Sequence, residues 1–283
     1  MKRVAKRTIT RSLLYIRTLE KLIDSGTLVV SSGQLALMTG FSDVQIRKDI
    51  SNFKKALEIK PNDEMAFYNL GSAYLEKGNI DEAVHHLLKA LNIRPDYPAA
   101  LNNLGEAFVK KGDYDKANYY FERALIIDTK SSGTLMNFAN ALFLQAKPDE
   151  AISLYKKLLQ TDSENADVHY NLACVLSFKK KCNEAIRHYY KTLSINPKYL
   201  NAHYNLGNIY LNQGKAAEAF KHYAEVIKIK PDYVQAYNKL GFILIKQGKF
   251  RKAGVFFSRA LELDPDFSEA RTNLDFVRKR MSK

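Results

Sequence analysis

Apolar residues recur along most of this chain at the spacing of amphipathic helices, and the whole pattern repeats every 34 residues. Six copies follow one another in phase, at 64–97, 98–131, 132–165, 166–199, 200–233 and 234–267. Within a copy, an Asn-Leu-Gly triplet recurs in the first half, as at 69–71. An alanine recurs in the second half, as at Ala83. The pattern therefore predicts an all-α chain built from repeated pairs of helices.

Small residues at fixed positions predict how the two helices of a copy pack. A glycine after the leucine lets the first helix approach the second closely, and the recurring alanine of the second helix packs against it. An aromatic residue or leucine four positions after that alanine fills the gap to the neighbouring copy. These large residues are Leu87, Phe121, Tyr155, Tyr189, Tyr223 and Phe257.

Over its whole length this pattern resembles the tetratricopeptide repeat. The resemblance implies antiparallel helix pairs stacked into a right-handed α-solenoid with a concave groove. We expect the solenoid to span 54–283, with a half repeat at 54–63, six repeats at 64–267 and a capping helix at 268–280. In that last helix Ala270, Leu274, Val277 and Met281 are expected to face inward. Copies three and four are the weakest, because Ala139 replaces the glycine and Lys180 replaces a turn glycine.

Residues 1–53 carry a different pattern, which predicts three helices. The first follows the apolar residues of 11–24 and ends at Gly26, and the second spans 33–39 after the capping serines. The third helix begins after Ser42 and buries one stripe, Ile46, Ile50, Phe53 and Leu57. The same helix also matches the second helix of a repeat, since Phe53, Ala56 and Pro61 fall where that helix has its aromatic residue, its alanine and its terminating proline. We therefore expect an N-terminal helix-turn-helix continuous with the solenoid, without a linker.

The exposed face of the third helix carries the candidate DNA contacts. A short helix, a tight turn and a second helix with an exposed Arg-Lys pair is the arrangement that enters a major groove. Arg47 or Lys48 can contact guanine or phosphate, Val44 can contact a thymine methyl group, and the basic arm can follow the backbone. The predicted DNA-binding residues are Lys2, Arg3, Lys6, Arg7, Ser31, Ser32, Ser42, Val44, Gln45, Arg47, Lys48 and Ser51.

Three stretches of this segment, 11–22, 30–42 and 45–53, resemble the N-terminal winged-helix domain of the Rex family of bacterial redox-responsive repressors. The resemblance implies that Ser31 and Ser32 open the second helix and that Arg47, Lys48 and Asp49 lie on the DNA-reading helix. This chain departs from the family after Phe53, where helix replaces the Gly-rich wing. It also has no GxGxxG motif for the family's nucleotide-binding domain, so NADH sensing is not implied.

Asparagine occupies one first-helix position in nearly every copy, and the resemblance places that position on the concave face. A carboxamide both donates and accepts hydrogen bonds, so such a ladder can hold the backbone of an extended protein segment or peptide. Tyrosines beside the ladder can stack on that peptide. The predicted peptide-binding residues are Asn69, Asn103, Asn137, Asn171, Asn205, Lys239, Asn273, Tyr68, Tyr170 and Tyr204.

The composition indicates a preference for polyanionic partners and offers few candidate catalytic residues. The net charge is +14, and residues 1–60 hold twelve basic against five acidic residues, a net charge of +7. Two cysteines without a framework pattern indicate a reducing compartment, so we expect a cytoplasmic protein. His169 and His203 occupy a packing position, and Cys174 and Cys182 do not have metal-site spacing. We expect no enzyme, no cofactor, no metal site and no membrane span.

Two functions are consistent with these patterns. The first is a DNA-binding regulator or adaptor whose helix-turn-helix binds duplex DNA while the repeats bind a protein or peptide. The alternative is a pure interaction scaffold in which 1–53 form an N-terminal cap or a partner surface.

Overall fold

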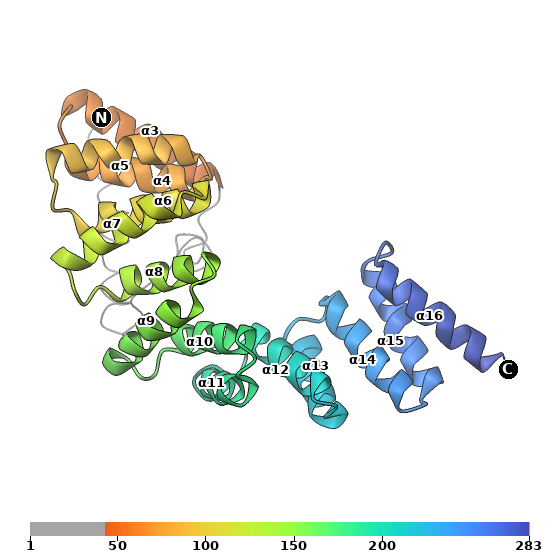
Figure 1. The fold of residues 1–283 in the computed structure, drawn as a ribbon. Helices are drawn as coiled ribbons and strands as arrows, with labels where there is room; N and C mark the ends of the chain where they lie inside the picture. The colour runs from red at the N-terminus through yellow and green to blue at the C-terminus, as the bar shows by residue number, and fades with distance from the viewer. Residues whose placement is uncertain (1–42, 283) are drawn as a thin grey trace. The chain divides into compact units, whose positions relative to one another are not determined.

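The computed structural model describes residues 43–282, and within that range the regular secondary structure is helical throughout (Figure 1). This confirms the predicted all-α fold for the described part of the chain. No helix among these residues has the length and hydropathy needed to cross a bilayer. The helices are α3 Asp43–Ile59, α4 Glu64–Glu76, α5 Ile80–Ile93, α6 Pro98–Lys111, α7 Tyr114–Ile127, α8 Ser132–Leu144, α9 Pro148–Thr161, α10 Ala166–Phe178, α11 Cys182–Ile195, α12 Leu200–Asn212, α13 Ala216–Ile229, α14 Val234–Lys246, α15 Phe250–Leu263 and α16 Ser268–Met281.

The chain divides into two compact units, 1–154 and 155–283. The division falls inside α9, in the third copy, which the sequence marks as one of the two weakest. Within the first unit α4 packs against α5 and α6 against α7, and within the second the pairs are α10 with α11, α12 with α13 and α14 with α15. Each of these pairs belongs to one 34-residue copy, as predicted.

Close approach of the paired helices depends on the glycine of the first helix. A Cβ atom added at Gly105 would lie 2.5 Å from Cε1 of Phe121, and one added at Gly207 would lie 2.7 Å from Cε1 of Tyr223. Both aromatic side chains are fully buried. The predicted role of these glycines is therefore confirmed, because any side chain there would overlap the partner helix.

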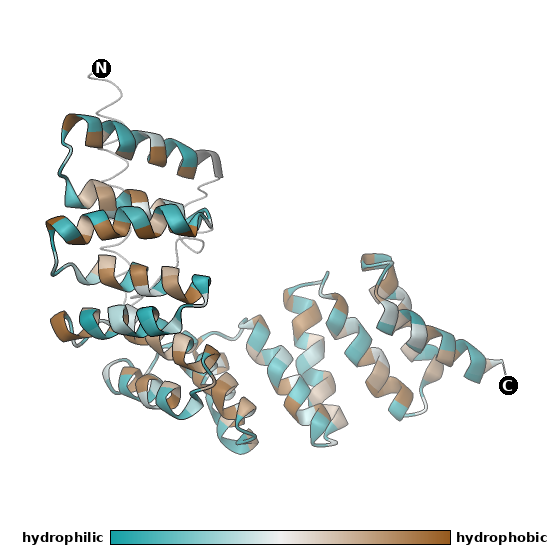
Figure 2. Ribbon diagram, turned by 45° about the horizontal axis from the view of Figure 1, so that its top comes forward, coloured by the Kyte–Doolittle hydropathy of each residue, from teal (hydrophilic) through white to brown (hydrophobic). Residues whose placement is uncertain are grey.

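Apolar residues alternate with polar ones along the helices, as the brown and teal bands of Figure 2 show, and the buried residues are mostly apolar. In the first unit, Leu87, Leu104 and Phe121 form one core cluster with the alanines of α6, α7 and α8. In the second unit, Phe257, Leu274 and their neighbours form a cluster between α14, α15 and α16. Burial of these stripes is the main stabilising term in a stack of short helices.

The turns inside the copies need a left-handed residue after the first helix. Glycine supplies it at Gly78, Gly112, Gly214 and Gly248, where φ lies between 71° and 81°. In the two weak copies Ala146 (φ 58°) and Lys180 (φ 59°) adopt the same conformation with a side chain attached. Backbone strain is therefore confined to these two turns among the described residues.

Helix α3 is continuous from 43 to 59 and packs on α4. Ile50 is buried against Leu70 and Tyr74, and Ile46, Phe53 and Leu57 pack around it, which confirms the predicted stripe. The first 42 residues lie outside the described part of the chain, so the first two predicted helices stay predictions.

The predicted last helix is present as α16, and Ala270, Leu274 and Val277 are buried. The prediction for Met281 is wrong, because its side chain is 50% exposed. Met281 lies in the last turn of α16, beyond the end of the core cluster, where no other helix of the described chain covers it.

Candidate functional site

The predicted asparagine ladder lies on the first helices of the copies, which are joined to one another by polar side chains. In the first unit Nδ2 of Asn103 donates to Oγ of Ser72 at 2.8 Å. Nδ2 of Asn102 donates to Oδ1 of Asn103 at 3.2 Å, and Nδ2 of Asn137 donates to Oδ1 of Asn102 at 3.1 Å. The carboxamides therefore connect α4, α6 and α8 side by side.

The second unit repeats this arrangement with other partners. Nδ2 of Asn205 donates to the hydroxyl of Tyr189 at 3.2 Å and lies 3.4 Å from the hydroxyl of Tyr170. Nδ2 of Asn273 donates to Oδ1 of Asn238 at 3.0 Å. Lys239, which interrupts the ladder, forms an ion pair with Glu269 at 3.6 Å. The amide nitrogens of Asn103, Asn137, Asn205 and Asn273 are used between copies. Oδ1 of Asn103 accepts from Asn102, whereas Oδ1 of Asn205 and of Asn273 can accept from a ligand.

The predicted tyrosines pack against three further tyrosines, with the two rings of each pair tilted. Ring centroids are 4.9 Å apart for Tyr68 and Tyr97 and for Tyr170 and Tyr199, and 5.2 Å apart for Tyr204 and Tyr233. Burial raises the pKa of Tyr97 to about 12 and raises the pKa of Tyr68, Tyr170 and Tyr204, so these hydroxyls stay protonated. Tyr97, Tyr199 and Tyr233 each occupy the last position of a copy, and this recurrence in the sequence identifies them as the partners.

Two histidine pairs occupy equivalent positions in the fourth and fifth copies. His169 and His188 approach with Nδ1 atoms 2.9 Å apart, and His203 and His222 with Nδ1 atoms 3.1 Å apart. Nε2 of His203 lies 3.1 Å from the carbonyl oxygen of Pro197, so it carries a proton and Nδ1 accepts from His222. The expectation that His169 and His203 are packing residues is confirmed by their burial. Their hydrogen-bonded partners could not be identified from the sequence.

Within residues 43–282 there is no cluster of three or more histidine, cysteine or carboxylate side chains able to hold a metal ion. Cys174 lies beside the ladder, since Tyr189 donates to its Sγ at 3.4 Å and Nδ2 of Asn205 lies 3.7 Å from the same atom. Cys182 is a free thiol at the first residue of α11. Burial, with repulsion from His203, lowers the pKa of His222 to about 4.

Of the predicted DNA contacts, only those on α3 fall in the described part of the chain. Arg47, Lys48 and Ser51 are exposed, and Lys48 lies on the side of α3 opposite buried Ile50. For Val44 and Gln45 the structure describes only the helical backbone. Lys2, Arg3, Lys6, Arg7, Ser31, Ser32 and Ser42 lie outside the described residues, and these contacts stay predictions.

Models of the tetratricopeptide repeat match this chain at 52–85, 98–131 and 234–267, and a model described as TPR repeat matches at 71–112, 179–214 and 207–248. The chain is a tetratricopeptide-repeat protein. A model described as putative DNA-binding protein N-terminus matches residues 3–51. Tetratricopeptide repeats support a protein-interaction scaffold, typically without catalysis of its own. No curated protein matches the chain.

Several solved structures share the fold of this tetratricopeptide-repeat protein. The crystal structure of the MamA protein is 26% identical, covers 61% of this chain and 94% of its own, and has a TM-score of 0.54. The Pseudomonas aeruginosa pilF protein is 21% identical over 74% of this chain and 95% of its own, with a TM-score of 0.64. YrrB, a TPR protein described as having an unusual peptide-binding site, is 20% identical over 66% and 96%, with a TM-score of 0.54.

Proposed function

We propose that this protein is a non-enzymatic, cytoplasmic adaptor that binds an extended segment of a partner protein along the asparagine ladder. The observation that carries the proposal is the orientation of the ladder carboxamides. Because Nδ2 of Asn205 and Asn273 donates to the preceding copy, Oδ1 of each is left to accept, and within the described chain no donor reaches it. An extended backbone offers N–H donors at regular intervals, which matches such a row of acceptors.

The tyrosine pairs beside the ladder strengthen this assignment. Tyr170 and Tyr204 are half-buried and already packed against Tyr199 and Tyr233, so little side-chain entropy is lost when a peptide packs on them. Their hydroxyls remain donors near neutral pH, since burial raises the pKa of both. A peptide carbonyl is the complementary acceptor. The peptide-binding description of YrrB agrees with this use of the fold.

Random-peptide display on the purified full chain tests the proposal. The selected peptides are then measured against Asn205→Ala plus Asn273→Ala, and against Asn183→Ala plus Asn212→Ala, which removes two exposed asparagines outside the ladder. We expect the ladder variant to bind about tenfold more weakly, the size of two lost hydrogen bonds, and the control to bind as the wild type does. Equal affinity in both variants would refute the ladder as the binding site.

A second proposal concerns residues 1–53, which we propose form a Rex-like helix-turn-helix that binds duplex DNA and is joined to the repeats at 54–283. The match of 3–51 to the putative DNA-binding model supports it, as does the exposure of Arg47 and Lys48. Helix α3 packs its other face on α4, so DNA and the repeats would meet on one rigid helix. A regulator that recruits a partner protein to DNA would follow from both proposals together.

A salt titration of duplex binding tests this second proposal. Phosphate contacts make affinity fall steeply with salt, and each lost contact reduces the slope of log affinity against log salt by about 1. We expect Arg47→Ala plus Lys48→Ala to show the shallower slope. The matched control is Lys156→Ala plus Lys157→Ala, an exposed basic pair on α9. If the wild type binds no duplex at low salt, the scaffold alternative holds and 1–53 act as a cap.

A further inference from the structure

Gly254 stands in the interior of α15 without any local requirement for glycine. Its φ is not positive, and a Cβ added there would meet only Cγ1 of Val277 at 3.6 Å and Cδ1 of Leu274 at 3.8 Å, which are ordinary contacts. A helix-interior glycine costs about 1 kcal/mol relative to alanine. The same position holds a side chain in every other copy, namely Val84, Asn118, Ile152, Ile186 and Phe220. Phe220 uses it to contact Phe256 of the next copy, with centroids 6.3 Å apart.

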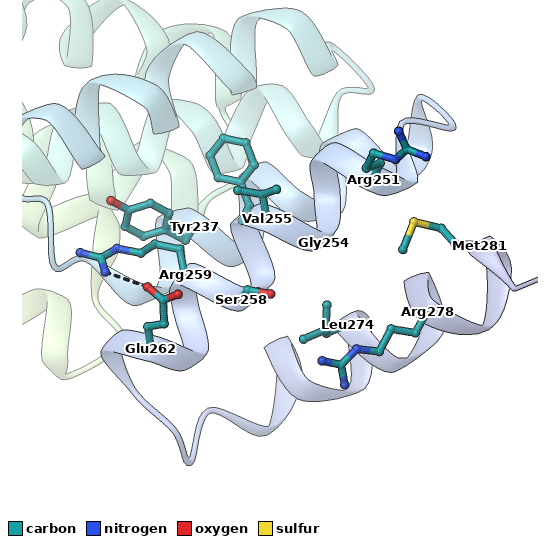
Figure 3. A pocket seen from close by; sticks show the side chains of 11 residues that line it. Tyr237, Arg251, Gly254, Val255, Ser258, Arg259, Glu262, Leu274, Arg278 and Met281 are labelled. Carbon is teal, nitrogen blue, oxygen red and sulfur yellow. Dashed lines mark hydrogen bonds and ion pairs between the residues drawn. The ribbon is translucent and has the colours of Figure 1, made fainter.

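Gly254 lines an open pocket of about 590 Å³ between α15 and α16, to which Tyr237 of α14 also contributes (Figure 3). Its apolar lining includes Leu274 and the exposed Val255 and Met281, which are 67% and 50% accessible. This volume is that of a small-ligand cavity or of several side chains of a docked helix.

The pocket is not shaped for a helix of the repeat type. In the internal copies, the second helix packs on two positions of the first helix. One holds a glycine or alanine, and the other, three residues later, holds a large apolar residue such as Phe108 or Leu244. In α16 the corresponding residues are Asp275 and Arg278, both exposed and 3.6 Å apart as an ion pair. A second helix at the close spacing of the repeats would have to take this exposed ion pair out of water, and that desolvation is costly. An occupant must therefore bind less deeply and match the charges.

Basic residues dominate the rim. Arg251, Arg259 and Arg278 line the pocket; Arg259 pairs with Glu262 at 2.9 Å, and Arg278 pairs with Asp275 at 3.6 Å. Arg251 has no carboxylate within ion-pair distance in the described chain. Figure 3 shows Arg251 near one end of the pocket and the Arg259–Glu262 ion pair at the other, so the basic group without an ion-pair partner lies at the Arg251 end.

We propose that this pocket is a second docking surface, separate from the ladder, for an acidic amphipathic helix of a partner protein. One large apolar side chain of that helix fills the space above Gly254 and contacts Leu274 and Met281. Carboxylates on either side of it pair with Arg251 and Arg278, and arginine holds carboxylates bidentately. The binding mode is a helix in a groove, with one apolar anchor.

A synthetic amphipathic helix of leucine and glutamate, labelled for fluorescence anisotropy, is the probe for the full-length protein. Its controls are the same peptide with lysine for glutamate and a scrambled peptide of equal composition. Gly254→Leu fills the pocket, and Arg251→Glu reverses one exposed rim charge. Asn205→Ala plus Asn273→Ala separates this surface from the ladder. Circular dichroism melts establish that each variant is folded.

We expect the acidic amphipathic peptide to bind, and the lysine and scrambled peptides to bind at least tenfold more weakly. Gly254→Leu should weaken binding about tenfold or more, because the anchor is excluded, while its melting temperature does not fall. Arg251→Glu should weaken binding and flatten its salt dependence, and the ladder variant should bind normally. The proposal is overturned if the acidic peptide does not bind the wild type, or binds Gly254→Leu and Arg251→Glu with wild-type affinity.

Discussion

The same substitution at two helix-interior glycines should change stability in opposite directions. Alanine is favoured over glycine in a helix by about 1 kcal/mol. At Gly254 the new methyl group meets nothing closer than 3.6 Å, so the whole gain remains and Gly254→Ala should stabilise the second unit by about 1 kcal/mol.

At Gly105 the same gain is opposed by overlap with the partner helix. The added Cβ would lie 2.5, 2.7 and 2.8 Å from three ring atoms of Phe121, whose side chain is fully buried and cannot swing away. Inserting an extra methyl group into a packed core costs about 1–3 kcal/mol. Ala139 and Ala173 occupy the same position in other copies, so a helix pair can adjust to one methyl group. We therefore expect the overlap at Gly105 to cost about 2 kcal/mol of stability. Gly105→Ala should therefore destabilise the first unit by about 1 kcal/mol.

Hydrogen exchange read by mass spectrometry is the suitable assay, since repeat arrays open in parts and a single melting curve averages over them. Opening free energies of α6–α7 should fall in Gly105→Ala, and those of α15–α16 should rise in Gly254→Ala. The two variants should differ by about 2 kcal/mol. If Gly105→Ala stabilised its helices as much as Gly254→Ala, close approach at the glycine would not explain the repeat pattern.

Two further predictions follow from the turns and from the histidine pairs. Ala146→Gly and Lys180→Gly should each raise the free energy of unfolding by about 1 kcal/mol, because they relieve left-handed strain, whereas Gly78→Ala should lower it; urea titration followed by circular dichroism measures all three. Because the pKa of His222 lies near 4 in the folded state and near 6.5 when unfolded, the unfolded chain binds more protons between these values and stability should fall as the pH drops from 6.5 to 4. His222→Phe should flatten that part of the pH–stability curve, as Phe256 occupies the same position in another copy, and an unchanged slope would contradict the assignment.

For residues 43–282, local periodicity alone was enough to predict the helices, the register of the copies and the pairing of α4 with α5, α6 with α7, α10 with α11, α12 with α13 and α14 with α15. Contacts within a copy join residues at fixed separations, such as Gly105 with Phe121, so a repeating pattern reveals them directly. The stripe of α3 and the burial of His169 and His203 were predictable for the same reason, because each depends on one helix and its nearest neighbour.

Contacts between copies were decided only by the tertiary structure. Whether Nδ2 of Asn205 faces a ligand or the hydroxyl of Tyr189 depends on how α12 lies against α10 and α11, which no spacing within one helix specifies. The same holds for the Nδ1 contact of His203 with His222 and for the pocket at Gly254, which is a property of two helices together. The sequence specifies which side chain stands at each position. Packing between copies decides which partner it hydrogen-bonds and whether it is exposed.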